Sequence, residues 1–323
     1  MLRSMYSGIS GLKNFQTKLD VIGNNIANVN TYGFKKGRTV FKDMISQTVA
    51  GASAATNTRG GVNPKQVGLG SQMAAIDTIH TGGSLQSTGR VLDLAISGDG
   101  FFQVADGTGA TATTGPTGYN NILYSRAGNF YMDSKGYVVN SDGKFLVGVS
   151  TSPTGTPAVM PLASTVSAVT TPGNLDAATP IDGIAEKSPV TITGYTPAFK
   201  PMQIPTDAQS MSIGQDGTVT FVDKAGDLRW AGQIVMAKFP NTGGLNKVGA
   251  NYFDSSPNSG TPLLSTATQE GMGEIASGFV EMSNVDLSEE FTEMIVAQRG
   301  FQANTRIITT SDEILQELVN LKR

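Results

Sequence analysis

The sequence predicts an α+β fold: long N- and C-terminal α-helices that pair as a coiled coil, with a β-rich middle made of a β-domain plus a small inserted β-domain. Three observations predict this class. Apolar residues recur at helical spacing near both ends of the chain, and Asp-Gly dipeptides interrupt short apolar runs in the middle. Charged residues make up only 15% of the 323 residues, and the 39 glycines favour turns over a helical enzyme scaffold.

The first element is expected to be a helix within residues 1–30. Its apolar residues follow one another mostly at steps of three and four, and one row falls at intervals of seven: Met5, Leu12, Leu19 and Ile26. A sustained seven-residue repeat is typical of a coiled-coil seam or a long bundle helix. Three glycines inside the helix each cost roughly 1 kcal/mol relative to alanine, so the helix needs a packing partner.

Four asparagines lie where this helix should end, at positions 24, 25, 28 and 30. Asparagine is a mediocre helix former because its amide competes for nearby backbone groups. Two interpretations stay open. The amides pair with those of other copies of the chain, or they mark the frayed end of an intramolecular coiled coil that stops at Gly33.

The middle is expected to be rich in strands. Residues 73–147 and 197–277 are predicted to form a β-rich domain, because runs such as DLAISGDGFFQVADG and SIGQDGTVTFVD are short, apolar and bounded by Asp-Gly. Asp-Gly favours type I′ hairpin turns, in which both central residues have positive φ. The Thr- and Pro-rich residues 148–196 are predicted to be a small inserted outer domain, and residues 31–72 and 278–284 are predicted to be linkers.

The last element is expected to be a helix over residues 285–323. Its seven-residue row begins at Val280 and continues through the C-terminal segment. Each terminal helix carries more apolar surface than a two-helix hairpin can cover, so the surplus predicts contacts with other copies of the chain. The predicted assembly interface comprises Leu2, Met5, Ile9, Leu12, Leu19, Ile22, Asn24, Asn25, Ile26, Asn28, Leu287, Met294, Phe301, Ile308, Leu315 and Leu318.

The composition argues against a catalytic or metal-binding site. The absence of cysteine excludes disulfides, thiolate metal sites and a cysteine nucleophile, and the single histidine, His80, excludes a zinc site of several imidazoles. A glycosidase would need two positioned carboxylates, but Asp93, Asp99 and Asp216 each have a turn or strand-end explanation. We therefore predict no catalytic, cofactor-binding or metal-binding residues, and no cofactor.

Nucleic acid and membrane are also not expected as partners. The net charge is −3, and the basic residues near positions 35–38 and 322–323 have no clustered aromatic residues beside them. The longest uncharged run, residues 145–175, contains four prolines, so it cannot form a membrane helix. The N-terminus has no apolar core followed by a cleavage site, so no cleaved signal peptide is expected.

Two terminal segments carry a resemblance to a known family. They read SGISGLKNFQTKLDVIGNNIANVNTYGFKKGR near the start and GFVEMSNVDLSEEFTEMIVAQRGFQANTRIITTSDEILQELVNLKR at the end. Both resemble the rod and hook axial proteins of the bacterial flagellum, as do TGRVLDLAISGDGFFQV, YSRAGNFYMDSKGYVV and GMGEIASG between them. The resemblance covers most of residues 1–147 and about residues 197–323.

The resemblance implies a structural role. In such proteins both terminal helices form the inner wall of a helical homopolymeric tube around an export channel, and the asparagines would cap the helix where it leaves that wall. Gly23 and Ile26 look more like a hook subunit, as does the length, which leaves room for an insert. A hook subunit would form a curved, flexible universal joint that transmits torque from rod to filament. It would lie outside the cell after leaving through the flagellar type III export apparatus, and would meet rod, hook cap and hook–filament junction proteins.

Two alternatives stay open beside the hook subunit. A distal rod subunit of the flagellar basal body would share every terminal motif. A secreted β-rich adhesin, from another class, would suit the Thr- and Gly-rich middle, but it leaves the two seven-residue repeats unexplained.

Overall fold

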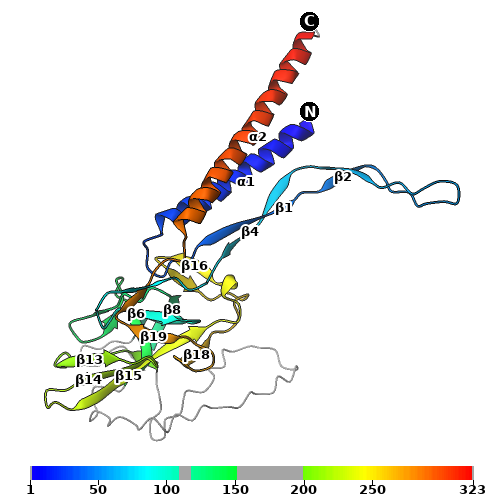
Figure 1. Cartoon of the computed structure of the whole chain (residues 1–323). Coiled ribbons are helices and arrows are strands. Elements are labelled where there is room, and N and C mark those ends of the chain that lie inside the picture. Colours follow the sequence, from blue (N-terminus) through cyan, green and yellow to red (C-terminus); the bar gives the residue numbers. More distant parts are fainter. Residues whose placement is uncertain (1, 109–117, 151–198, 322–323) are drawn as a thin grey trace. The chain divides into compact units, whose positions relative to one another are not determined.

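The computed structural model describes residues 2–108, 118–150 and 199–321 (Figure 1). They form two compact units, which we call unit 1 (Met1–Thr81 with Ser283–Arg323) and unit 2 (Gly82–Met282). Helices at both ends and a β-rich middle confirm the predicted mixed α/β class. Most of the predicted insert, residues 151–196, lies outside the described residues.

Unit 1 combines the two terminal helices with four strands. Its elements are α1 (Leu2–Ala27), β1 (Gly37–Asp43), β2 (Ser46–Ala50), β3 (Lys65–Gly68), β4 (Ser71–Thr78) and α2 (Leu287–Leu321). The helices pack against each other in antiparallel order, because Gly8 lies against Ile308 and Gly11 lies against Asn304. Both chain ends therefore lie at the same end of the helix pair (Figure 1).

The inner ends of both helices are set by polar capping. Asn28 donates from its backbone N–H to the carbonyls of Asn24 and Asn25, and from its side chain to Asn24 O at 2.9 Å. Helix α2 begins after Asp286, whose carboxylate accepts the backbone N–H groups of Ser288 (2.8 Å) and Glu289 (3.4 Å). The seven-residue row therefore starts before the helix, since Val280 lies in a strand of unit 2.

A long hairpin leaves the helix pair. Strand β1 pairs with β4, β2 pairs with β3, and bridges Ser53–Val62 and Thr56–Arg59 continue the pairing to the tip. We call residues 37–78 the arm (Figure 1). The β1–β4 part of the arm packs on α1, and at its far end Asn14 donates to Ser71 Oγ at 2.8 Å. Every residue of β2 and β3 is exposed. Ile45, which directly precedes β2, is also exposed, with 79% of its surface accessible.

Unit 2 is built on one large antiparallel sheet. Its path runs β13-β14-β15-β11-β7-β8-β17-β16, with β9, β10, β12 and β18 paired beside it, while β6–β19 and β5–β20 form separate pairs. The strands are β5 (Leu85–Ser87), β6 (Leu94–Ser97), β7 (Phe101–Thr108), β8 (Gly118–Ser125), β9 (Tyr131–Met132), β10 (Val138–Val139), β11 (Phe145–Ser150), β12 (Phe199–Pro201), β13 (Ser210–Ile213), β14 (Thr218–Val222), β15 (Leu228–Lys238), β16 (Asn246–Gly249), β17 (Tyr252–Asp254), β18 (Leu263–Thr266), β19 (Glu274–Ser277) and β20 (Phe279–Glu281), with a short 3₁₀ helix at Thr242–Gly244.

Apolar side chains from many of these strands form the core of unit 2. Phe102 and Phe130 meet edge to face with ring centroids 5.4 Å apart, in a cluster that also buries Leu94 and Ile234. Gly128 lies against the backbone of Leu94, whose N–H donates to Gly128 O at 2.9 Å. The backbones of Gly128 and Leu94 therefore approach closely beside the bulky rings of the core.

The Asp-Gly hairpins do not use the predicted turn type. In the Asp142–Gly143 and Asp216–Gly217 turns the glycine has positive φ, at 78° and 80°, while neither aspartate does. In each turn the glycine N–H donates to the carbonyl of the residue three positions earlier. A second backbone hydrogen bond closes the loop, as from Gly214 N–H to Thr218 O. These are three-residue loops with a left-handed glycine, so the expectation of type I′ turns was wrong.

A buried ion pair joins distant parts of unit 2. Arg126 and Glu281 have side chains only 3% and 1% exposed, with Nη1 3.3 Å from the carboxylate. Arg126 also donates to Gly98 O at 2.8 Å, and the other Glu281 oxygen accepts the N–H of Gly83 at 3.0 Å. Burial lowers the pKa of Arg126, while the Glu281 carboxylate opposes that shift.

Candidate functional site

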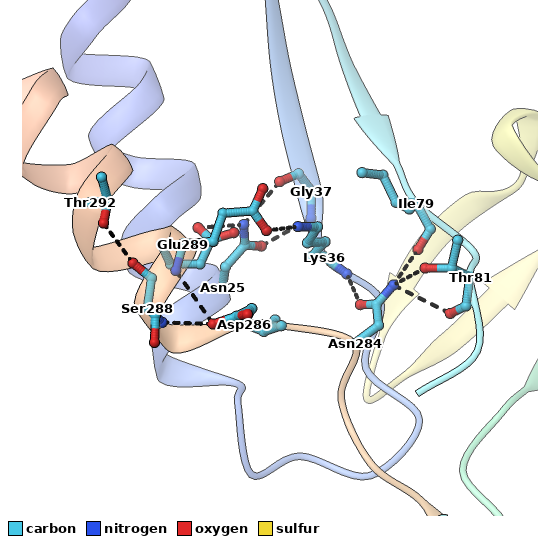
Figure 2. Close-up of polar contacts among 12 residues, drawn as sticks. Asn25, Lys36, Gly37, Ile79, Thr81, Asn284, Asp286, Ser288, Glu289 and Thr292 are labelled. Carbon is cyan, nitrogen blue, oxygen red and sulfur yellow. Dashed lines mark hydrogen bonds and ion pairs between the residues drawn. The ribbon is translucent and has the colours of Figure 1, made fainter. Parts of the chain in front are cut away.

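Three segments of unit 1 meet at the buried side chain of Asn25. Its amide oxygen accepts the N–H of Gly37 at 2.9 Å, and its amide nitrogen donates to the carbonyl of the same residue, also at 2.9 Å (Figure 2). The nitrogen donates as well to Glu290 Oε2 at 3.1 Å. With 2% of its surface exposed, Asn25 thus joins α1 to the root of the arm and to the first turn of α2.

Asn284 connects a second set of segments in the same region. Its side-chain oxygen accepts the N–H of Lys36 at 2.8 Å, and its nitrogen donates to Ile79 O at 2.9 Å and to Thr81 Oγ1 at 3.1 Å (Figure 2). We call Asn25, Lys36, Gly37, Asn284 and Glu290 the junction. It holds both strands of the arm root and the chain that leads into α2.

Opposite charges surround the junction. Lys36 contacts Glu289 with Nζ 2.7 Å from the carboxylate (Figure 2), and Lys18 forms an ion pair with Glu293. Such partly exposed pairs contribute only about 0–1 kcal/mol each. Lys35 is 1% exposed and donates to Thr81 O at 2.9 Å. The acidic start of α2 is therefore occupied by basic groups of the N-terminal segment of the same chain.

The predicted interface residues have different environments in the single chain. Ile22 and Asn25 are buried, while Ile9, Asn24 and Leu287 are exposed. The side chains of Leu2 and Leu318 lie outside the described set. The half-buried residues are Met5, Leu12, Leu19, Ile26, Asn28, Met294, Phe301, Ile308 and Leu315.

Large apolar side chains remain uncovered on unit 1. Phe291, Ile295 and Val296 of α2 are each more than half exposed, and so is Tyr6 of α1. A shallow groove lined by Asp312, Leu315, Gln316, Val319 and Asn320 follows the outer part of α2. Apolar residues on helices of a stable protein are normally covered, so this surface is suited to contact other molecules.

Sequence reasoning found Asn25 but missed its partners. Gly37, Asn284 and Glu290 were not expected at a site, since Asn25 and Glu290 lie 265 positions apart. One local signal was present: Asp286 followed by Glu289 has the spacing of a helix N-terminal capping box. It marks where α2 begins, but it does not say which segment packs there.

Replacing Asn25 with leucine should open the junction. The change leaves the N–H and carbonyl of Gly37 and the Glu290 carboxylate without their amide partner, and each such buried group costs about 1–3 kcal/mol. We expect faster hydrogen exchange at Gly37, measured by mass spectrometry on the full chain. Asn24→Leu is the matched control, because Asn24 is exposed. Equal exchange rates at Gly37 in both variants would contradict this role for Asn25.

The described ranges hold neither a cluster of metal ligands nor a helix that could span a membrane. No group of three or more acidic, histidine or cysteine side chains is placed there to bind a metal ion. Within the same residues, neither helix is long and apolar enough to cross a membrane.

Family profiles match three parts of the chain. Residues 5–35 match the flagella basal body rod protein profile, and residues 95–221 match the flagellar hook protein FlgE/F/G D1 domain. Residues 276–321 match the flagellar basal body rod FlgEFG protein C-terminal profile. The first and last matches contain most of α1, all of α2, and three of the five junction residues: Asn25, Asn284 and Glu290.

Curated relatives match over the whole chain. The flagellar basal-body rod protein FlgG of Bacillus subtilis is 52% identical over 324 aligned positions, which cover 100% of both chains. The flagellar hook proteins FlgE of Borreliella burgdorferi and Treponema pallidum are 34% and 29% identical over 453 and 475 positions, again covering 100% of both chains.

These relatives change the preference between hook and rod. The length predicts a hook subunit from the sequence alone, but the FlgG relative aligns over 324 positions, whereas the hook relative of Borreliella burgdorferi aligns over 453. The distal rod alternative is therefore supported better than the hook. All of these relatives are structural proteins and none is an enzyme. The chain belongs to the FlgE/FlgF/FlgG family of structural proteins that build the rod and hook of the bacterial flagellum.

Proposed function

We propose that this chain is a distal rod subunit of the flagellar basal body, which polymerises into a tube through its terminal helices. The observation that carries the proposal is the 52% identity to a basal-body rod protein over the full length of both chains. The hook subunit is the second candidate, favoured by the two full-length hook relatives at lower identity.

The exposed apolar side chains of unit 1 support assembly through the helices. Phe291 is 51% exposed on α2 and Ile9 is 48% exposed on α1. Fully burying an exposed apolar side chain contributes about 1.5–3 kcal/mol, so covering a half-exposed one against a neighbour contributes roughly half of that. In the polymer, α1 and α2 would pair as a coiled coil, and other copies of the chain would cover the interface residues that the sequence predicts.

The arm supports the same proposal. A two-stranded hairpin is marginally stable in water on its own, and the outer half of the arm exposes Ile45, Val49, Val62 and Val67. A neighbouring copy that covers these residues would stabilise the arm. Asn25 and Asn284 would act inside each subunit, by holding the arm root beside the helices, while Asn24 would face a neighbour.

The proposal includes the family's partners and location. The chain would contact further copies of itself and adjacent rod proteins, and it would leave the cell through the flagellar type III export apparatus without a cleaved signal peptide. Contacts with the hook cap and the hook–filament junction proteins belong to the hook candidate. The domain layout would be helices inside, the linkers and β-rich domain further out, and the insert outermost.

Electron microscopy of basal bodies from a strain lacking this chain tests the proposal. We expect rods that stop short and carry no hook, and full-length rods again after the wild-type gene is restored. Complete rods that end cleanly without a hook would instead support the hook candidate. Normal flagella would contradict both.

A further inference from the structure

At two contacts between the terminal helices, a glycine of one helix faces a larger side chain of the other. The ring of Phe15 occupies the space beside Gly300, where a Cβ atom would lie only 2.5 Å from Phe15 Cζ. Real Cβ atoms are essentially never this close to another heavy atom, so α2 accepts this ring only because residue 300 has no side chain.

A second pair has the opposite arrangement. Here the glycine belongs to α1: a Cβ on Gly11 would lie 2.9 Å from the side-chain nitrogen of Asn304. That amide is held in place because it donates to Gly300 O at 3.0 Å. Along α1 the order is small then large, at positions 11 and 15, and along α2 it is small then large at positions 300 and 304.

The apolar repeat alone does not determine how the helices align. A slip by one heptad, about 10 Å along the axis, would again place one apolar row opposite the other. The junction holds only the first turn of α2, and Asn304 lies on the order of 20 Å further along. We infer that Phe15–Gly300 and Gly11–Asn304 are the positioning pairs that set the register of α1 against α2.

The pairs disfavour the registers that are shifted by four or by seven residues. A shift of one turn in one direction places Phe15 opposite Asn304, where two large side chains collide. A shift of one turn in the other direction places Gly11 opposite Gly300 and leaves a void. A shift of one heptad places Phe15 opposite Ile307 or Glu293, neither of which leaves room for a ring.

A compensating pair of substitutions tests the inference. Gly300→Ala should displace Phe15, and Phe15→Leu in the same chain should restore the fit, because leucine lacks the ring atoms Cζ and Cε that the new methyl group would meet. Gly23→Ala is the matched control. It raises helix propensity in the same way, but its Cβ meets nothing within 4 Å.

Cross-linking reports the register directly. The chain has no cysteine, so Lys18→Cys with Glu293→Cys gives one defined pair at positions that are neighbours in the structure. In the full chain, we expect Gly300→Ala to lower the yield with a short bismaleimide several-fold. Phe15→Leu should return the yield to the starting level, and Gly23→Ala should leave it unchanged.

Assembly in a strain lacking the chain is the second measurement, and this part rests on the proposed function. Gly300→Ala should prevent the chain from restoring rods, and the double variant should restore them. An unchanged cross-link yield, or a loss that Phe15→Leu does not repair, would overturn the register inference. If the wild-type chain restores no structure, the proposed function fails while the cross-link result still decides the register.

Discussion

Replacing Glu281 with glutamine is expected to lower the free energy of unfolding of unit 2 by about 3–5 kcal/mol. Glutamine keeps an oxygen for the N–H of Gly83, but it removes the carboxylate that forms an ion pair with the buried guanidinium of Arg126. The single tryptophan, Trp230, lies buried in unit 2, so urea unfolding of the full chain followed by its fluorescence measures this change.

Two further variants isolate the buried charge as the cause. Asp207→Asn breaks the exposed pair with Lys224, and it should change stability by less than about 1 kcal/mol. Arg126→Met combined with Glu281→Leu removes both charges, and should recover most of the stability that Glu281→Gln loses. If Glu281→Gln were as mild as Asp207→Asn, the ion pair would not hold unit 2 together.

Replacing Gly128 with alanine is expected to destabilise unit 2 by about 3 kcal/mol or more, through overpacking. The new methyl group would be placed 1.6 Å from Leu94 O and 3.2 Å from the Phe102 ring. The backbone would have to move, and it would break the hydrogen bond from Leu94 N–H to Gly128 O. Urea unfolding followed by Trp230 fluorescence measures this loss as well.

Gly143→Ala separates crowding from backbone strain. Gly143 has φ of 78°, so alanine is strained there by about 1–2 kcal/mol, but nothing lies within 4 Å of its added Cβ. The Gly128 variant should therefore lose clearly more stability than the Gly143 variant. The reverse order would show that the close approach to Leu94 is not what requires glycine.

The sequence predicts the helices well because their repeat is long. Rows of apolar residues seven apart, such as Met5 to Ile26, continue for longer than a short strand can, and α1 and α2 cover all of both rows except Val280. Central strands of unit 2 such as β14 are recognisable because one face is more buried than the other. The sequence predicts a linker rather than strands for the arm up to residue 72, because β2 and β3 are exposed on both faces and show no alternation.

The site is only partly visible in the sequence. The asparagine cluster marks the place, but nothing local distinguishes Asn25, which is buried, from Asn24, which is exposed. That difference depends on Glu290 and Gly37, which the fold brings to it from other segments. Gly23 resembles a hook subunit in the sequence, yet its surroundings are open in the single chain, so internal packing does not select glycine there.

Unit 1 is assembled from the first and the last segments of the chain, which the ribosome makes at different times. About 260 residues separate the end of α1 from the start of α2. At a synthesis rate of roughly 5–20 residues per second, α1 leaves the ribosome on the order of tens of seconds before α2 exists. Throughout this interval Phe15, Gly11 and Asn25 lack their α2 partners. The first helix is thus available to other proteins of the cell until translation is nearly complete.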